Sequence, residues 1–392
     1  MNILTFNAGS SSLKCSLIDT TGERTLASGN ADWTDRPTRY TFGLPDSKAT
    51  NSELDRADVR SAVSRFTADL QDYLSDNVSA VAHRVVHGGM RFTKPVIVTE
   101  NVKNELHALA PLAPLHNPRS LEGIVAAQAL LPNLPHVAVF DTAFHSTLAP
   151  EAYTYPIPSQ WTKQWKLRRF GFHGLSHAYA ADKAAQILDR PLAELRLIVA
   201  HLGNGASLAA IRDGKSIDTT MGFTPLEGLM MGTRSGSVDP GLLLHLLREQ
   251  EISAVDLDRT LNEESGLLGV SGVSSDMRSV MLAAEAGDER AELAIAMYVH
   301  RLRQAIAAMA ATLGGVDALV FTGGVGEHSA TIRAATCKGL VFIGLELDPI
   351  ANAAGRADVV VSAAESNGII IVVSSNEELI LARMALRTVD PL

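Results

Sequence analysis

Residues 3–19, ILTFNAGSSSLKCSLID, are the stretch on which the expected fold depends. Residues 3–6 form an apolar run that predicts a buried strand, and residues 13–18 alternate as a second strand. The turn between them is longer than a two-residue hairpin loop. Its small side chains let backbone N–H groups approach a polyanion, and Lys14 adds a positive charge. By itself the hairpin fits a phosphate-binding loop and an ordinary serine-rich turn equally well.

Length and composition restrict the class of protein. A chain of 392 residues exceeds one ordinary core and predicts two domains, and 46% hydrophobic with 20% charged residues is typical of globular proteins. The net charge of −9 argues against a nucleic-acid or anionic-membrane binder, although local arginines could hold a small anion. The two cysteines, Cys15 and Cys337, suggest neither a zinc site nor a disulfide framework. With no signal peptide or membrane-spanning run, we expect a cytoplasmic protein.

A second hairpin resembles the first. Residues 197–214, LIVAHLGNGASLAAIRDG, again give an apolar strand, a small-residue turn and a second strand, and Asn7 and Asn204 each begin such a turn. This repeat predicts two related α/β domains, with coincidence as the alternative. Prolines at 150, 156 and 158 place the boundary near 148. We therefore expect domains at residues 1–148 and 149–392, with a final helix at about 377–390 that packs back across the cleft between them.

Two arginines are candidate anion ligands. Arg84 ends an apolar strand beside two glycines, and Arg234 lies in a glycine-rich loop without a carboxylate at helical spacing. Guanidinium groups in such loops suit carboxylate and phosphate, and the alternative is a pair of structural salt bridges. Asp141 and Glu377 also end apolar strands. Both are candidate magnesium or proton-handling groups, although helix capping explains Glu377 nearly as well.

Other motifs are weaker. His173, between Phe172 and Gly174 before a helix, is the best histidine candidate, and its i,i+4 partner His177 lacks the intervening glutamate of a metalloprotease motif. Residues 324–329 lack the third glycine of a dinucleotide loop, so a plain nucleotide-facing glycine turn is expected there. Residues 214–216 imitate the end of a P-loop but lack its first glycine and lie between two strands.

Nine segments together resemble the acetate kinase family along nearly the whole chain. They are residues 7–14, 83–89, 112–118, 140–145, 171–177, 201–205, 221–228, 231–234 and 376–379. The resemblance implies an α/β fold of two duplicated actin-like ATPase (ribonuclease H-like) domains with the active site in the cleft between them. It also implies a homodimer and a reversible transfer of the ATP γ-phosphoryl group to acetate, giving acetyl phosphate and ADP. Mg²⁺ is the implied metal, with Mn²⁺ as the alternative.

The resemblance also implies residue roles. The catalytic residues would be Asp141, His173 and Arg234. The acetate-binding residues would be Arg84, Val86, Leu115, Phe172 and Pro225. The metal would be held by Asn7 and Glu377. The nucleotide would be bound by Lys14, His201, Leu202, Gly203, Asn204, Gly205, Asp276, Met277, Arg278, Gly324, Val325, Gly326, Glu327 and His328.

Elementary chemistry refines two of these expectations. Acetate is already ionised at pH 7, so Asp141 is expected to orient an arginine or metal-bound water rather than act as a general base. Met277 departs from the aromatic residue common near the adenine in the family, which leaves the base preference open. One rival is a propionate or butyrate kinase, since one methylene changes binding by only about 1–3 kcal/mol, although Val86 favours acetate by its bulk. The other is an ATP-driven chaperone or filament protein of the same fold.

Overall fold

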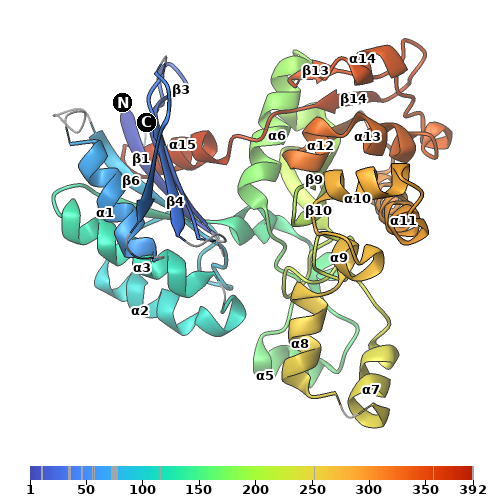
Figure 1. The fold of residues 1–392 in the computed structure, drawn as a ribbon, viewed down its shortest axis with the longest axis horizontal. Coiled ribbons are helices and arrows are strands. Elements are labelled where there is room, and N and C mark those ends of the chain that lie inside the picture. Colours follow the sequence, from blue (N-terminus) through green and yellow to red (C-terminus); the bar gives the residue numbers. More distant parts are fainter. Residues whose placement is uncertain are drawn as a thin grey trace. The chain divides into compact units, whose positions relative to one another are not determined.

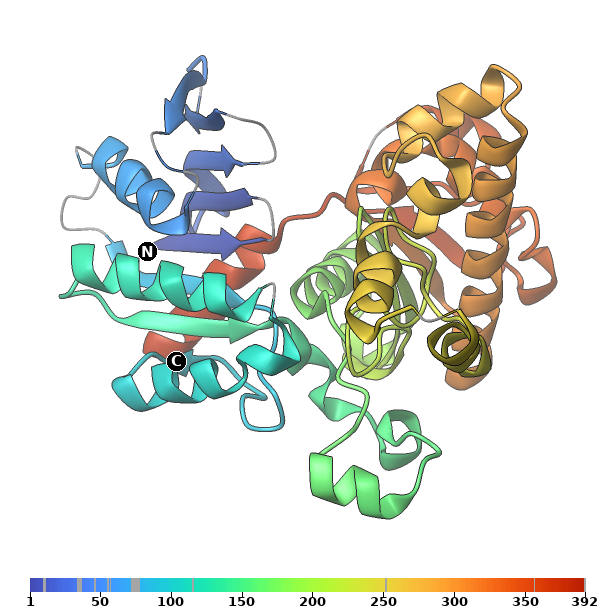
Figure 2. The same cartoon turned by 60° about the horizontal axis from the view of Figure 1, so that its bottom comes forward.

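Two mixed β-sheets organise the chain, one in each of two units (Figures 1 and 2). The computed structural model describes all residues except 10–11, 34–36, 46, 55, 57, 72–77, 115, 251, 356 and 391–392. Unit 1 comprises Met1–Phe144 and Asn376–Leu392, and unit 2 comprises His145–Ser375. No helix in the described part of the chain is both long and apolar enough to cross a membrane.

The sheet of unit 1 has the strand order β5-β4-β3-β2-β1-β6-β8-β7. Its strands are β1 (Asn2–Ala8), β2 (Ser12–Asp19), β3 (Arg24–Asp32), β4 (Thr38–Gly43), β5 (Thr50–Leu54), β6 (Val78–Val85), β7 (Val96–Ile97) and β8 (His136–Phe140). Strands β1 to β5 are antiparallel, whereas β1, β6 and β8 are parallel. The parallel strands therefore end at one edge of the sheet.

Helices cover both faces of this sheet. They are α1 (Val59–Asp69), α2 (Glu100–Ala108), α3 (Asn117–Leu130) and α15 (Glu377–Val389), with 3₁₀ turns at Ala110–Leu112 and Asp141–Thr147. Leu4 and Phe6 of β1 pack in one core with Phe66 of α1 and Ala127 of α3. Successive strand residues point to opposite faces, so Asn7 points the other way, toward α15.

The sheet of unit 2 has the order β11-β10-β9-β12-β14-β13. Its strands are β9 (Arg196–Leu202), β10 (Ala206–Arg212), β11 (Lys215–Thr219), β12 (Ala318–Thr322), β13 (Val359–Val360) and β14 (Ile369–Val372). Its helices are α4 (Pro150–Tyr153), α5 (Ser159–Trp165), α6 (Gly174–Ile187), α7 (Pro240–Glu249), α8 (Ala254–Glu263), α9 (Gly266–Ser271), α10 (Met277–Glu285), α11 (Glu289–Leu313), α12 (Gly323–His328), α13 (Ala330–Cys337) and α14 (Pro349–Ala353). Further 3₁₀ turns lie at Leu192–Glu194 and Val341–Ile343. Helix α6 packs on β9 and β12, and α11 packs on β9, β10 and β11.

The two sheets share one topology, which confirms the duplication expected from the sequence. In each unit three antiparallel strands lead to two parallel ones, β3-β2-β1-β6-β8 and β11-β10-β9-β12-β14. The expected equivalence of Asn7 and Asn204 is wrong, however. Asn7 is still within β1, opposite Lys14, whereas Asn204 lies in the turn after β9. The strand position equivalent to Asn7 is that of His201, opposite Ser207.

One further element differs from the expectation. Helix α12 begins directly after β12, so the expected glycine turn is the first turn of a helix. Gly323 allows this because it has φ +77°, and a Cβ there would lie 2.9–3.0 Å from the Leu202 backbone. The C-terminal helix α15, which was expected to pack back from the second domain, groups with unit 1 because it packs on β1, β6 and β8.

A pair of buried histidines links two parallel strands of unit 1. The ring of His83 on β6 stacks between Phe6 and His136, with centroid distances of 5.7 and 5.2 Å. His136 Nε2 lies 3.1 Å from the Leu131 carbonyl, to which it donates, so His136 Nδ1 accepts from His83 Nε2 at 2.9 Å. Burial lowers the pKa of both rings from 6.5, that of His83 strongly, so both are neutral at pH 7.

This pair predicts acid sensitivity of unit 1. A buried neutral histidine has a lower pKa folded than unfolded, so the unfolded chain binds more protons as the pH falls below 6.5. Stability conferred by the neutral ring is complete above that pH and is lost below it, by up to about 1.4 kcal/mol per pH unit for each proton. His83→Phe keeps an aromatic ring on Phe6, and we expect it to flatten this slope between pH 6.5 and 5.

The measurement is urea unfolding followed by fluorescence of Trp33, in a background in which Trp161 and Trp165 are phenylalanine. Trp33 packs on the core of unit 1, whereas the other two tryptophans belong to unit 2. His107→Gln, an exposed position on α2, is the control and should keep the wild-type slope. Equal slopes in His83→Phe and the control would contradict the assignment.

Candidate active site

Four polar side chains of unit 1 meet where its parallel strands end. Arg84 of β6 forms a two-pronged ion pair with Asp141, which follows β8, with Nε–Oδ1 and Nη2–Oδ2 distances of 2.9 and 2.6 Å. Arg84 Nη1 donates to Asn7 Oδ1 at 2.8 Å, and Asn7 Nδ2 donates to Glu377 Oε2 at 3.3 Å. Glu377 is the first residue of α15, 370 positions from Asn7. The structure thus brings together four residues of the expected site.

The charges of this cluster do not cancel. Burial alone would lower the pKa of Arg84, but Asp141, Glu377 and Glu378 outweigh it and raise the pKa of the guanidinium. Burial raises the pKa of Asp141, and the two hydrogen bonds from Arg84 oppose that shift. Arg84 thus lies within 4 Å of two carboxylates, Asp141 at 2.6 Å and Glu377 at 4.0 Å. One positive and two negative charges leave the cluster with a net negative charge.

This donor set fits a hard divalent cation. Among the described residues no group of three or more histidine, cysteine, aspartate or glutamate side chains forms a complete metal cage. Mg²⁺ in kinases is held differently, by one or two carboxylates together with substrate phosphates and water. The oxygens of Asn7 and Glu377, beside an excess negative charge, are of the required kind. They therefore fit magnesium better than a transition metal.

The chain after β6 is held by two side chains that the sequence analysis did not single out. Asn117 accepts from His87 N at 3.1 Å and donates to His87 O at 3.0 Å, and Thr142 Oγ1 accepts from Gly88 N at 3.0 Å. These bonds fix the backbone next to Val86, which is buried. The sequence signal that could have identified them was their position in the chain. Thr142 directly follows the candidate Asp141, and Asn117 is the first residue of α3. The expected acetate ligand Leu115 lies outside the described residues.

In unit 2, His173 and Arg234 converge on the turn between β9 and β10. His173 precedes α6 with φ 57°, a left-handed conformation that is uncommon for a residue with a Cβ. A Cβ built on Gly205 would lie 3.1 Å from His173 Nε2 and 3.4 Å from Arg234 Nη2. The glycine therefore leaves space in front of both groups. Phe172, expected in the acetate pocket, is buried, and its carbonyl lies 3.0 Å from His145 Nε2.

Arg234 differs from Arg84 in its partners. Its Nη1 donates to the carbonyl of Pro225 at 2.9 Å and contacts Met231 Sδ at 3.6 Å. Within the described ranges no carboxylate forms an ion pair with it, and burial lowers its pKa. A guanidinium remains charged under all ordinary conditions. The group is thus a largely buried positive charge whose counter-ion does not come from the described protein, as expected of an anion site.

A second network, which the sequence analysis missed, supports Pro225. Arg169 Nη1 donates to the carbonyls of residues 219, 220 and 221, and its Nη2 lies 2.6 Å from Glu227 Oε1. Tyr155 donates to Glu227 Oε2 at 2.5 Å and accepts from Phe223 N at 2.8 Å. The segment that holds Arg234 is thereby fixed on both sides of Pro225.

Three segments expected to bind the nucleotide meet in unit 2. Gly232 N donates to Asn204 O at 3.0 Å, and a Cβ on Gly232 would lie 2.1 Å from Asn204 Oδ1 and 3.0 Å from Ser275 O. Gly232 therefore lies between the β9–β10 turn, residues 203–205, and Ser275, which precedes α10. On its other side, α12 packs on β9 through Gly323 and Gly326, which approach Ala200 and Leu202.

Individual nucleotide candidates differ in exposure. Asp276 caps α10 by accepting from Arg278 N at 2.8 Å, and the exposed Arg278 side chain pairs with Asp276 at 2.7 Å. Met277 is buried, whereas Glu327 accepts from Ser375 N at 2.9 Å. Lys14 belongs to unit 1, where it lines a cavity of about 240 Å³ with Glu378.

Known proteins resemble the chain over almost its whole length. Residues 2–383 match the acetokinase family. An acetate kinase of Synechococcus sp. (strain JA-2-3B'a(2-13)) is 48% identical over 396 residues, which cover 97% of this chain and 98% of that relative. The crystal structure of Porphyromonas gingivalis acetate kinase superimposes with a TM-score of 0.92 at 40% identity, covering 99% of this chain and 100% of that one.

A propionate kinase structure is similarly close. The enzyme from Francisella tularensis subsp. tularensis SCHU S4 has a TM-score of 0.92 and 38% identity, covering 98% of both chains. Together these similarities confirm the expected fold class, two duplicated actin-like α/β domains.

Proposed function

The chain belongs to the acetokinase family, and from that membership we propose how its residues carry out the reaction. It is an acetate kinase, a phosphotransferase that uses ATP and whose acceptor is a carboxyl group. We propose that the transfer is reversible and requires Mg²⁺, with Mn²⁺ as a substitute. The observation that carries the residue assignment is Arg234, a largely buried guanidinium without a described carboxylate partner, beside His173.

The proposed chemistry is a direct in-line displacement. One oxygen of acetate, already ionised, forms the new bond to the γ-phosphorus while the bond to the β–γ bridging oxygen breaks, and ADP leaves with that electron pair. In the transition state, the charge on the three equatorial oxygens of the transferring phosphoryl group is the feature that differs most from the ground state. Arg234 would stabilise it through its planar set of donors, and His173 through Nε2.

Arg84 and Asp141 have complementary proposed roles. Asp141 engages Nε and Nη2 of Arg84 and so fixes the plane of the guanidinium. The remaining nitrogen, Nη1, points to Asn7. This geometry supports Asp141 as the group that orients Arg84, which would bind the acetate carboxylate, rather than as a general base. Val86, Phe172 and Pro225 remain the proposed contacts of the acetate methyl group.

Asn7 and Glu377 would hold the metal, which neutralises phosphate charge when bound. The nucleotide is proposed to bind at the β9–β10 turn, the start of α10 and the start of α12. Both cysteines are buried and free, which fits the proposed cytoplasmic location.

Replacement of Arg234 tests the assignment. Without its charge the transferring phosphoryl group loses its main counter-charge, so Arg234→Ala should lower kcat/KM by about a thousandfold, and Arg234→Lys by less. Acyl phosphate is trapped with hydroxylamine and measured as hydroxamate, with acetate, propionate and butyrate as acceptors. Arg212→Ala, an exposed arginine at the end of β10, is the control and should match the wild type. Near-normal rates in Arg234→Ala would contradict the role assigned to Arg234. A clear preference of the wild type for propionate over acetate would contradict acetate as the acceptor.

The metal assignment is tested at the start of α15. Glu377→Gln removes one carboxylate from the cluster, and we expect the Mg²⁺ concentration for half-maximal activity to rise at least about tenfold. Glu378→Gln is the matched control, because it removes the neighbouring charge from the same helical turn. If both variants show the same Mg²⁺ dependence as the wild type, Glu377 does not hold the metal.

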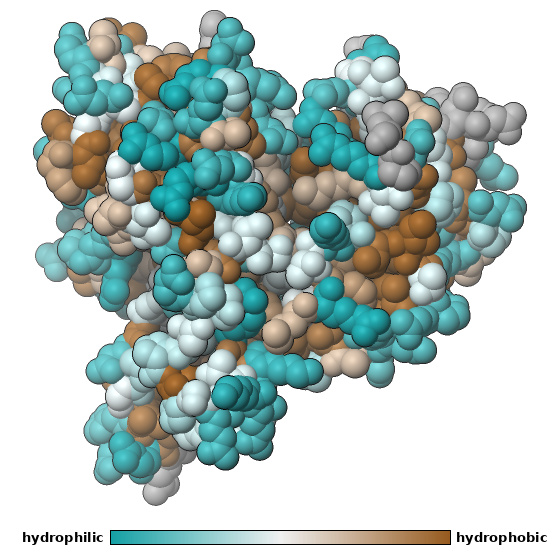
Figure 3. Space-filling model, turned by 180° about the vertical axis from the view of Figure 1, so that it is seen from behind, coloured by the Kyte–Doolittle hydropathy of each residue, from teal (hydrophilic) through white to brown (hydrophobic). Residues whose placement is uncertain are grey.

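The homodimer is also proposed, with α7 as its interface. No residue of α7 is buried, even though the helix is rich in leucine. Leu242, Leu244 and Leu247 are 47%, 53% and 37% exposed. Figure 3 shows apolar residues among hydrophilic ones on the part of unit 2 that carries α5, α7 and α8 in Figure 1. A helix with exposed leucines of this kind is typical of a surface that a partner covers.

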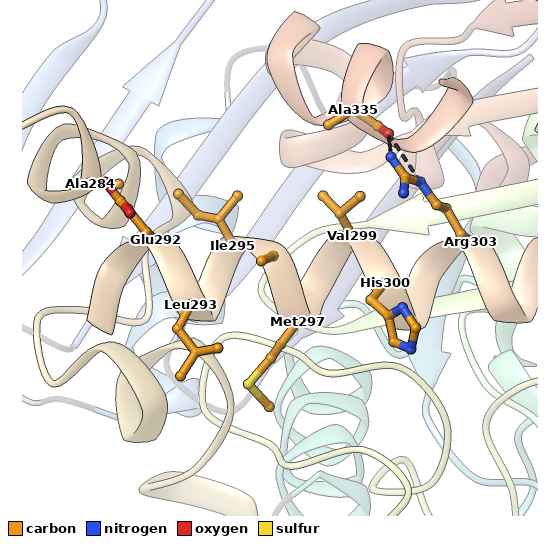
Figure 4. Close-up of a pocket in the computed structure, with 10 residues that line it drawn as sticks. Ala284, Glu292, Leu293, Ile295, Met297, Val299, His300, Arg303 and Ala335 are labelled. Carbon is orange, nitrogen blue, oxygen red and sulfur yellow. Dashed lines mark hydrogen bonds between the residues drawn. The ribbon is translucent and has the colours of Figure 1, made fainter. Parts of the chain in front are cut away.

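A second apolar surface provides the control. A groove of about 690 Å³ follows α11, lined by Leu293, Met297 and His300 among others, and Arg303 donates to the Ala335 carbonyl beside it (Figure 4). Leu244→Glu should convert the dimer to a monomer in analytical ultracentrifugation. Leu293→Glu, at a leucine of equal exposure (54%), should leave it dimeric. Dissociation by Leu293→Glu alone would move the interface to α11.

A further inference from the structure

A buried serine lies between two histidine rings in unit 2. Ser207 Oγ, on β10, is 3.0 Å from His173 Nδ1 and 2.8 Å from His177 Nε2. Ser207 and His177 have no exposed surface, and His177 lies one helical turn after His173 on α6. A hydroxyl group has one proton, so it can donate to only one of these two nitrogens.

The surroundings of His177 decide which nitrogen receives that proton. Its Nδ1 is buried, and no hydrogen-bond partner is found for it in the described part of the chain. A proton on Nδ1 would leave an unpaired buried N–H, which is rarer and more costly than an unpaired acceptor. The proton therefore belongs on Nε2, which donates to Ser207 Oγ.

The ring of His177 is also neutral. It is packed against His145, with a centroid distance of 5.6 Å, and against His201 at 6.5 Å. Burial, followed by the influence of these two rings, lowers the pKa of His177 well below 6.5. His145 is fixed as well, because its Nε2 donates to Phe172 O and its Nδ1 accepts from Ser216 Oγ at 2.8 Å. The one ring proton of neutral His145 is therefore donated to Phe172 O and not to Ser207.

We propose that His177, acting through Ser207, sets the tautomer of His173. Since Ser207 Oγ accepts from His177, its own proton is donated to His173 Nδ1. His173 then carries its proton on Nε2, the nitrogen that lies with Arg234 Nη2 beside Gly205. His177 and Ser207 are positioning residues, and they make His173 a hydrogen-bond donor at the atom that faces the reacting phosphoryl group. This inference rests on the proposed role of His173.

The first test reads the tautomer directly. In ¹⁵N-labelled wild-type enzyme, two-bond ¹H–¹⁵N spectra distinguish a protonated ring nitrogen from a bare one, and the signals lost in His173→Gln identify His173. We expect a bare Nδ1 and a protonated Nε2. A protonated Nδ1 in the wild type would overturn the proposal, whatever the variants show.

The second test separates the relay from general packing. Ser207→Ala should lower kcat by about tenfold, the equivalent of one net hydrogen bond, with KM for acetate and ATP within about twofold, and the His173 tautomer should become mixed. His177→Gln keeps a donor near the position of Nε2 and should retain the tautomer and most of kcat, whereas His177→Leu should lose both. His300→Gln, exposed on α11, is the matched control.

The outcomes distinguish this proposal from the proposed function. If Ser207→Ala and His177→Leu leave both kcat and the tautomer unchanged, the relay is excluded while acetyl phosphate formation stands. If the wild type forms no acetyl phosphate, the proposed function fails, and the spectrum still decides the tautomer. Should Ser207→Ala fail to fold, His177→Gln and His177→Leu test the relay instead. Equal kcat and an equal His173 tautomer in these two variants would exclude it.

Discussion

The polar cluster of unit 1 depends on the ion pair between Arg84, which is partly buried, and Asp141, which is buried. Two charges removed from water are tolerated only when each satisfies the other, and removal of one partner from such a pair costs about 3–5 kcal/mol. The pair joins the ends of β6 and β8, and the third guanidinium nitrogen extends the contact to Asn7 of β1. Glu377 completes the cluster only because α15 packs on the same strands. The packing of α15 on the first unit therefore places Glu377 in the cluster.

The two arginines show how surroundings give identical side chains different uses. Carboxylates surround Arg84, so its charge is largely matched by the protein and its orientation is fixed. Arg234 meets a carbonyl and a thioether instead, and carbonyl dipoles compensate a full charge only in part. In the proposed function the anionic substrate would supply the missing counter-charge. The bonds of Arg169 to Glu227 and to three carbonyls hold the segment around Pro225, whose carbonyl accepts from Arg234.

The sequence was sufficient for the strands, the duplication and the principal charged residues, because apolar runs and residue types are local properties. It was insufficient where the outcome depends on register or distant partners. Asn7 and Asn204 both begin a run of small residues, but composition does not say where a strand ends, and a shift of a few positions separates them. Likewise, Gly323 reads as a loop glycine, although its positive φ allows a helix to start. Asn117 and Arg169 were missed because their partners lie 30 and 58 residues away.

The histidines of unit 2 illustrate the same balance of charge. His145, His173, His177 and His201 lie in ring contact. A positive charge on His173 would lie beside that of Arg234 at Gly205. Burial lowers the pKa of His145 to about 4 and that of His177 well below 6.5, so both remain neutral. A neutral ring still has one donor and one acceptor, and hydrogen bonds to serines and a carbonyl fix which is which. The fold thereby obtains oriented dipoles around Arg234 without the desolvation cost of further charges, and oriented dipoles are what a developing negative charge requires.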